Sequence, residues 1–308
     1  MAHTSNVENI DLQALELLHG AVDLHVHANP HIAPQNHMLD AIELARMARD
    51  AGMAGMAIKD VTFPTIGTAY LVNKVVPGFR VFGSLVMNLV CGGVNPRAVF
   101  AAVNHAEGAK LIYFPTGDTL HHTIARERIN YTGVNLPTSR EQAITIVKDG
   151  KLTDETKDVL RIIAAADVCL VTGHLSPAET LILVAEAVSY GVKKILILHP
   201  MWQMIGFTRQ QLAELRKFPV FFEFEFGLCL PIMQFIHSES QVDPREMLKT
   251  MREIGVEKCV MTTDTGQAYA PSPVAAMKYF IAVMLKCGAT KDEIIAMTRK
   301  NPSALVGS

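Results

Sequence analysis

The stretch "DLHVHANP", residues 23–30, carries two histidines that are separated by one valine. Residues i and i+2 of a β-strand point to the same face, so His25 and His27 look the same way. Two neutral imidazoles at this spacing can bind one metal ion. A pair of buried histidines that only forms hydrogen bonds is the competing interpretation, and the pair alone does not decide between the two.

Further residues of metal-binding type stand where other apolar runs end. The run "VCLVTGHLS" reaches His174, "ILILHP" reaches His199 and "VMTTDTGQ" reaches Asp264. Histidines that serve only a core should occur anywhere along strands, whereas these occur at ends that would converge on one cavity. Imidazole and carboxylate ligands suit Zn²⁺, Mn²⁺, Fe²⁺ or Ni²⁺. We predict one or two divalent ions, with Zn²⁺ as first choice, on these ligands: His25, His27, His174, His199 and Asp264.

The elements that must position these residues are short apolar runs that alternate with helical patterns. Continuous apolar runs are typical of parallel strands that are covered on both faces. Eight such strands can close a barrel, so we predict an α/β fold, a (β/α)8 TIM barrel, as a single domain over residues 1–308. An open doubly wound sheet is the alternative, but no G-x-G-x-x-G or Walker loop follows any run. The predicted strands cover residues 21–28, 55–61, 80–87, 109–114, 168–174, 194–199, 220–226 and 258–263.

Two of the predicted helices have clear boundaries. In "HMLDAIELARMARDAG", residues 37–52, Met38, Ile42 and Ala45 fall on one face and Gly52 ends the run. In "SPAETLILVAEAVSYG", residues 176–191, a serine cap and a proline begin the helix and a glycine ends it.

The order of the candidate ligands resembles that of the amidohydrolase superfamily over nearly the whole chain. It comprises H-x-H on the first strand, one histidine at the end of the fifth, one at the end of the sixth and an aspartate on the eighth. The tail "TRKNPSALVG" is similar to the N-P-A-x-L-L-G ending of that superfamily. The chain most resembles a poorly characterised branch, in which stretches like "TGHLSPAE" and "TDTGQ" accompany a lysine near the second strand's end. The resemblance implies the barrel and metal-dependent hydrolysis, but no particular substrate.

Many binuclear members of that superfamily carry a carboxylated lysine on strand four. Lys110 lies five residues before Pro115, which places it too far down the strand to bridge metal ions. Lys59, in "GMAIKDVTFPT", stands at a strand end and is the better candidate. It could be a carboxylated bridge or a cation that holds an anionic substrate, and we assign it to catalysis and substrate binding. A lysine that reaches solvent at the barrel rim is the alternative.

Two glutamates share one face of the run "FFEFEFG", and the phenylalanines share the other. If the phenylalanines pack under the helices, Glu223 and Glu225 point into the barrel, where an unpartnered carboxylate would be costly. Possible partners are Lys59, a metal-bound histidine or the substrate, and we predict that both glutamates bind substrate. An ion pair that only stabilises the barrel is the alternative.

The connection after strand four is too long for a compact domain, so we predict a lid or hairpin insertion at residues 116–153. Within it, "AITIVKDGKL" predicts a β-hairpin that turns at Asp149 and Gly150. We assign His121 and His122 of this insertion to substrate binding. A surface excursion with two solvated histidines is the alternative. The single tryptophan, Trp202, favours core or interface packing over a place in the pocket.

The ligand set and the resemblance together predict a hydrolase that cleaves an amide, cyclic amide or lactone of a small molecule. Zn²⁺ can lower the pKa of a bound water to roughly 7. We expect catalytic roles for Asp264 as general base and then general acid, for Lys59 in polarising the carbonyl, and for His199. A metal-dependent decarboxylase of the same superfamily is one alternative. A barrel that binds a metal or ligand without catalysis is the other.

The composition is that of a compact globular protein. The 308 residues are 49% hydrophobic and 19% charged, with a net charge of −2. We find no basic stripe for nucleic acid, no secretory signal at the start, and no apolar run near the ~20 residues that a membrane helix needs. The five scattered cysteines indicate reduced thiols. We expect a cytoplasmic enzyme that forms a homo-oligomer.

Overall fold

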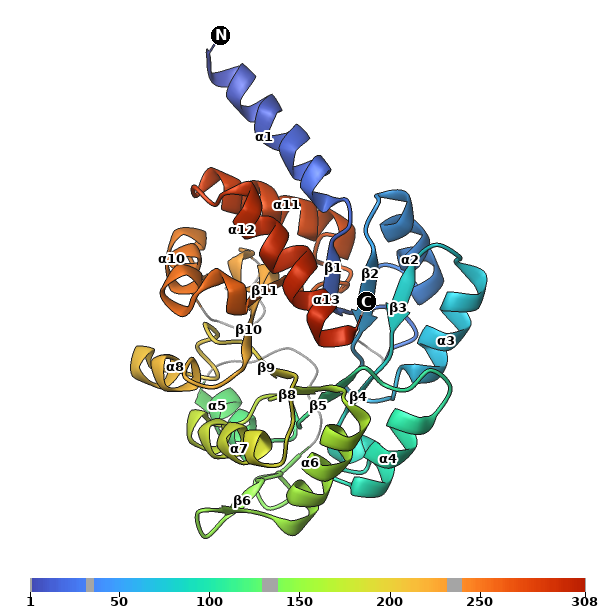
Figure 1. Ribbon diagram of the computed structural model, residues 1–308, viewed down its shortest axis with the longest axis vertical. Coiled ribbons are helices and arrows are strands. Elements are labelled where there is room, and N and C mark those ends of the chain that lie inside the picture. Colours follow the sequence, from blue (N-terminus) through green and yellow to red (C-terminus); the bar gives the residue numbers. More distant parts are fainter. Residues whose placement is uncertain (1, 32–35, 129–137, 232–239, 308) are drawn as a thin grey trace.

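The computed structural model describes residues 2–31, 36–128, 138–231 and 240–307. Strands occupy its centre and helices surround them (Figure 1). The strands are β1 (Val22–Val26), β2 (Gly55–Ile58), β3 (Arg80–Phe82), β4 (Ser84–Val86), β5 (Leu111–Tyr113), β6 (Val147–Lys148), β7 (Lys151–Leu152), β8 (Cys169–Val171), β9 (Ile195–Ile197), β10 (Phe221–Glu225) and β11 (Cys259–Thr262). The α-helices are α1 (Ala2–Leu18), α2 (Ala41–Asp50), α3 (Ile66–Val75), α4 (Pro96–Asn104), α5 (Leu120–Arg128), α6 (Asp154–Ala166), α7 (Pro177–Ser189), α8 (Arg209–Leu215), α10 (Pro244–Ile254), α11 (Pro273–Lys286), α12 (Lys291–Ile295) and α13 (Asn301–Val306).

The strands form an α/β fold with parallel sheets, as predicted, and each of the eight predicted segments contains a strand. One sheet has the order β1-β2-β3, and the other has the order β11-β10-β9-β8-β5-β4. Within both sheets every pair of neighbours is parallel. Strands β3 and β4 belong to one predicted segment, which Gly83 divides. A Cβ atom at Gly83 would lie 2.6 Å from the Cα of Ile66, so only glycine lets this segment approach the start of α3.

The outer strands β1 and β11 also meet at their carboxyl ends. Val26 and Thr265 form a parallel bridge, and the amide of Asp264 donates to the carbonyl oxygen of His25 at 2.9 Å. The amide of His27 donates in turn to the carbonyl oxygen of Thr265 at 2.9 Å. The backbone thus joins the H-x-H segment to the segment that carries the aspartate.

Helix boundaries follow local capping chemistry. The α7 prediction is confirmed, because Ser176 forms a capping box with Glu179 and Pro177 occupies the first turn. The prediction for α2 was wrong at its start, since Asp40 and Glu43 form a capping box there. That box begins the helix at Ala41, so Met38 lies outside the helix and is 44% exposed.

Apolar side chains form two layers on either side of the strands. The larger layer joins strands to the surrounding helices and includes Phe222, Phe224 and Phe226. The inner layer lies among the strands and includes Leu24 and Tyr113, together with Leu305 and Val306 of α13. The C-terminal helix therefore contributes directly to the inner core. The side chain of Asn301 fixes the start of this helix by donating to the carbonyl oxygens of Val256 and Cys259.

The predicted hairpin in the long connection is present. Strands β6 and β7 pair antiparallel, and both turn residues, Asp149 and Gly150, have positive φ. The hairpin side of this connection lies against the start of α7, where the hydroxyl of Thr145 donates to Glu179. Residues 129–137 of the predicted insertion lie outside the described residues.

Among the helices in the described ranges, we find none that is both long and apolar enough to cross a membrane.

Candidate metal centre

Three of the predicted histidine ligands converge on the carboxylate of the fourth residue, Asp264. Asp264 Oδ1 lies 2.9 Å from His25 Nε2 and 3.1 Å from His27 Nε2. Asp264 Oδ2 lies 3.9 Å from His199 Nε2. One ligand atom each from His25, His199 and Asp264 lie within 4.8 Å of one another. These residues come from three separate strand ends, so the predicted convergence of β1, β9 and β11 is present in the structure.

An irregularity in β1 turns the H-x-H pair toward the interior. The pairing of β1 with β2 shifts register between Asp23 and Val26. Leu24 belongs to the inner apolar layer, whereas Val26 belongs to the layer under the helices. Leu24 thus points inward and Val26 points outward, although they are two residues apart. After the irregularity the odd-numbered residues, His25 and His27, lie on the inner side. Bulges of this kind are common next to active sites because they re-aim side chains.

Two of the predicted ligand residues adopt backbone conformations that non-glycine residues rarely use. His199 has φ of +54° and Asp264 has φ of +49°. Each such residue costs on the order of 1–3 kcal/mol and persists only where its surroundings hold it. The next turn is equally constrained, because a Cβ atom at Gly266 would lie 1.9 Å from the carbonyl oxygen of His27. Glycine at this position lets the loop after β11 pack directly on the H-x-H segment.

Buried glutamates on β10 orient two of the rings. Glu223 Oε1 lies 2.6 Å from His25 Nδ1, and Glu225 Oε1 lies 2.6 Å from His199 Nδ1. A proton on each Nδ1 would leave Nε2 as the metal-binding nitrogen of the ring, and carboxylates commonly hold metal-ligating histidines in this way. Of the partners considered for these glutamates, the histidine rings are the ones that the structure places against them. Their assignment to substrate binding stays a prediction.

Lys59 follows β2 and lies inside the cluster, not at the solvent-exposed rim. Lys59 is 3% exposed as a whole residue, and its Nζ lies 3.0 Å from His25 Nε2. The ammonium also lies 5.2 Å from the centre of the Tyr113 ring. Burial lowers the pKa of Lys59, although nearby carboxylates, led by Asp264, act in the opposite direction. Lys110 immediately precedes β5 at the opposite end of the strands, as its spacing predicted.

His174 joins the cluster from the side of α5. Its Nδ1 lies 2.9 Å from the Nδ1 of His122, so one of the two rings donates to the other. Its ring centre is 5.2 Å from that of His199. The Nε2 of His174 is buried and has no hydrogen-bond partner among the described residues. His121 points elsewhere, because its Nε2 lies 3.0 Å from the carbonyl oxygens of Met204 and Ile205.

The charges in the cluster are strongly coupled. Burial would lower the pKa of His25, but Asp264 and Glu223 outweigh it and raise that pKa to about 9. Burial would raise the pKa of Asp264, but His25 and His27 hold it well below its usual range. Burial lowers the pKa of His27 to about 4 and that of His199 to about 3. Two neutral imidazoles and an ionised carboxylate are therefore available near neutral pH.

This donor set fits a divalent ion. Ligand atoms that share a tetrahedral Zn²⁺ at ~2.1 Å lie ~3.4 Å apart, which is close to the observed separations around Asp264. The Nε2 of His174 is a further buried donor without a partner in the described part of the chain. A cation would also compensate the carboxylate of Glu223, whose second oxygen is buried without a described hydrogen bond. Burial and the charge of Glu223 raise the pKa of Glu225 well above its usual range.

Asp23 was missed by the sequence analysis, whereas the core packing predicted for Trp202 is confirmed, since it is buried in an apolar cluster. Asp23 is completely buried and accepts from the hydroxyl of Thr263 at 2.6 Å and from the amide of His25 at 3.1 Å. Burial raises its pKa to about 7. Its signal was a charged residue inside an otherwise apolar strand. Trp202 packs edge-on against two ligand rings, with centre distances of 5.0 Å to His199 and 5.1 Å to His174.

Comparison with protein families gives one match. Residues 20–223 match the model of a family of unknown function, DUF6282. The chain belongs to this family. No curated protein matches the sequence of this DUF6282 member.

Solved structures share its fold over nearly the whole chain. A probable dipeptidase, PvdM, from Pseudomonas aeruginosa is 10% identical with a TM-score of 0.65, covering 97% of this chain and 98% of its own. A 2,6-dihydroxybenzoate decarboxylase from Rhizobium is 12% identical with a TM-score of 0.53, covering 94% and 99%. A probable 2-pyrone-4,6-dicarboxylic acid hydrolase from Acinetobacter baumannii is 14% identical with a TM-score of 0.60, covering 94% and 100%. At these identities the likeness shows that the chain shares the fold of these enzymes, which is the fold that the resemblance implied.

Proposed function

We propose that this protein is a metal-dependent hydrolase whose eight strand segments form a closed (β/α)8 barrel around a divalent ion. The observation that carries the proposal is the group of His25, His199 and Asp264, whose ligand atoms lie within 4.8 Å of one another. Glutamates that orient two of the rings add to its support, because a site for packing alone needs no such fixed tautomers. Zn²⁺ is our first choice of ion, with His25, His27, His174, His199 and Asp264 as its ligands.

The proposed substrate is a small molecule with an amide, cyclic amide or lactone bond. A bound divalent ion would supply Lewis acidity and an activated water at neutral pH. Asp264 is ionised there and is a quarter exposed, so its carboxylate can accept a proton and return it to the leaving nitrogen or oxygen. The oriented ring of His199 and the packed ring of Trp202 limit how a substrate can approach.

We propose two alternative roles for Lys59, as a substrate-binding cation or as a carboxylated metal ligand, and its position suits either. As an ammonium ion, it would bind an anionic or carbonyl oxygen of the substrate. As a neutral amine, favoured by its lowered pKa, it could add CO₂ at Nζ and release a proton to give a carbamate ligand. Lys59→Arg keeps a cation and Lys59→Glu keeps an anion, so the variant with more residual metal and activity identifies the role. A carbamate signal in ¹³C NMR after supply of labelled bicarbonate provides an independent readout.

A metal-dependent decarboxylase is the second candidate, and the position of Lys59 favours it. A buried cation 3.0 Å from a ligand ring could hold the carboxylate that leaves as CO₂. Release of CO₂ from aromatic and aliphatic carboxylic acids, measured beside hydrolysis of lactones and cyclic amides, separates the two reactions.

Elemental analysis of the purified protein tests the metal site directly. We expect bound divalent metal in the parent protein and a loss of at least one ion per chain in His25→Ala and in Asp264→Ala. His105→Ala, a change on the exposed end of α4, is the matched control and should keep the full content. Full metal content in both ligand variants would contradict the proposal.

A further inference from the structure

A second group of histidines lies beside the metal centre. One ring nitrogen each from His27, His31 and His37 lie within 4.8 Å of one another. The ring centres of His31 and His37 are 4.2 Å apart, and that of His27 lies 6.0 and 5.7 Å from them. The three side chains are nearly completely buried, with exposed fractions of 8% for His27 and 1% for His31, and 5% for the whole of His37.

The backbone holds these rings in place from two sides. The side chain of Asn29 donates to the carbonyl oxygen of His37 at 3.0 Å. His37 also forms an antiparallel bridge with Gln267, and the amide of Met38 donates to the carbonyl oxygen of Gly266 at 2.8 Å. The loop after β11 therefore fixes His37 as well as Asp264. The two histidine groups are parts of one framework, with His27 common to both.

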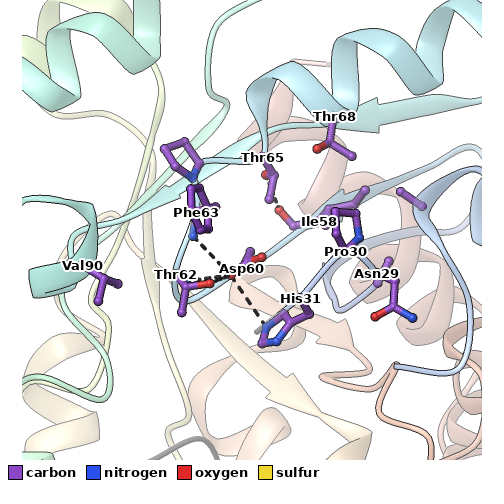
Figure 2. A pocket seen from close by; sticks show the side chains of 13 residues that line it. Asn29, Pro30, His31, Ile58, Asp60, Thr62, Phe63, Thr65, Thr68 and Val90 are labelled. Carbon is purple, nitrogen blue, oxygen red and sulfur yellow. Dashed lines mark hydrogen bonds and ion pairs between the residues drawn. The ribbon is translucent and has the colours of Figure 1, made fainter. Parts of the chain in front are cut away.

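A carboxylate and a cavity adjoin the group. His31 Nε2 lies 3.8 Å from Asp60 Oδ1, which is itself held by the amide and hydroxyl of Thr62 at 2.7 Å (Figure 2). Asp60 thus supplies negative charge beside the rings. His31 and Asp60 also line a cavity of about 490 Å³ between the starts of α2 and α3, with Phe63 on its wall. The cavity therefore borders the group at His31.

The closeness of the three rings suits a shared cation. One nitrogen of each ring lies within 4.8 Å of the others, so a single divalent ion could bind all three. Three histidines are also the ligand set of zinc sites that keep one position open for water or substrate.

We propose that His27, His31 and His37 bind a divalent ion of the Zn²⁺ class, separate from the ion at His25, His199 and Asp264. His27 can serve both sites because its Nε2 faces Asp264, while its Nδ1 is buried without a described hydrogen-bond partner. If both nitrogens bound an ion, His27 would lose its remaining ring proton to solvent. His31 and His37 are not ligands of the hydrolase centre, so either proposal can fail without the other.

Metal content after dialysis against equimolar amounts of Zn²⁺ tests this site. We expect His31→Ala/His37→Ala to hold one ion per chain fewer than the parent protein, and His105→Ala to equal the parent. In a His199→Ala/Asp264→Ala background, where the first site is broken, one ion should remain and should disappear when the other two changes are added. Equal metal content with and without His31 and His37 in both backgrounds would overturn the proposal.

A second measurement does not depend on the variants folding. Crystals of the unaltered protein, prepared with Zn²⁺ and measured at the zinc absorption edge, should show an anomalous peak about 2.1 Å from a nitrogen of each of the three rings. A peak only at the His25 and Asp264 position would overturn the second site and leave the hydrolase proposal intact. Peaks at neither position would contradict both.

Discussion

The two ends of the same strands bury opposite kinds of side chain. At the carboxyl ends lie His25, Lys59, His199 and Asp264, which form a network of close polar contacts. Further toward the amino ends, apolar residues such as Val22 and Leu196 pack with α13 in the inner layer. Both regions are buried, yet only the apolar one gains free energy from leaving water. Burial of the polar region therefore has to be explained by its chemistry.

The costs at the carboxyl ends are specific. Charged groups there lose their hydration, and two ligand residues occupy left-handed backbone conformations. Such costs are sustainable because the rest of each strand is apolar and well packed. The comparison predicts that changes at the carboxyl ends affect chemistry and metal binding, whereas changes at the amino ends affect the free energy of unfolding.

The largest effect is expected from Asp264→Asn. Loss of the proton acceptor should reduce kcat/KM by roughly 10³-fold, within the 10²–10⁴-fold range of general acid–base catalysis and equal to about 4 kcal/mol. The melting temperature should change by only a few degrees, as expected if the carboxyl ends of the strands serve chemistry and not stability. Steady-state kinetics on the substrate found by screening, with thermal unfolding of the same preparation, measures both. A variant with unaltered turnover would remove Asp264 from the mechanism.

At the other end, Leu305→Ala should destabilise the protein by about 2–5 kcal/mol. Leu305 is 1% exposed in the inner apolar layer, so truncation removes apolar contacts and leaves a cavity. Metal content and kcat of the folded protein should stay near the parent values. Urea unfolding followed by circular dichroism measures the free energy change. If Leu305→Ala greatly lowered the metal affinity but left the free energy of unfolding unchanged, the two ends of the strands would not differ in the way proposed.

A smaller effect should follow from Glu225→Gln. The change keeps the shape but replaces the carboxyl group that contacts His199 Nδ1 by an amide, so zinc affinity should fall by 10–100-fold, or about 1.4–2.7 kcal/mol. Competition with a chromogenic chelator measures this affinity. Glu214→Gln on the surface of α8 is the matched control and should have no effect. Unchanged affinity in Glu225→Gln would leave that glutamate with a packing role only.

The smallest expected effect comes from a surface pair and depends on pH. Arg252 lowers the pKa of Glu293 to about 2 through two charge-assisted hydrogen bonds. The group's ordinary pKa is near 4.5, so the pair stabilises the fold above that pH and loses this contribution as pH falls from 4.5 to 2. Glu293→Gln should cost about 1 kcal/mol at pH 7, since solvent screens the pair, and nothing near pH 2. Denaturant unfolding across this range checks the slope, and a cost independent of pH would contradict the assignment.

Much of the site could be anticipated because its signals are local. The alternation of H-x-H and the positions of His174, His199 and Asp264 at the ends of apolar runs depend only on neighbours in the sequence. The helix caps and the turn at Asp149 and Gly150 are local in the same sense. The start of α2 was misplaced because the hydrophobic pattern includes Met38, which precedes the capping box of Asp40 and Glu43 that begins the helix.

The sequence by itself determined the parallel α/β arrangement, the ligand types and their order along the chain, because apolar periodicity and strand-end chemistry can be read one segment at a time. Only the tertiary structure decided which partners meet: Glu223 with His25, Lys59 inside the cluster, and Trp202 on the ligand rings. It also brought His31 and His37 to His27. The physical reason is that these contacts join residues far apart in the chain, and their distances depend on the β1 irregularity and on loops whose conformations are set by packing.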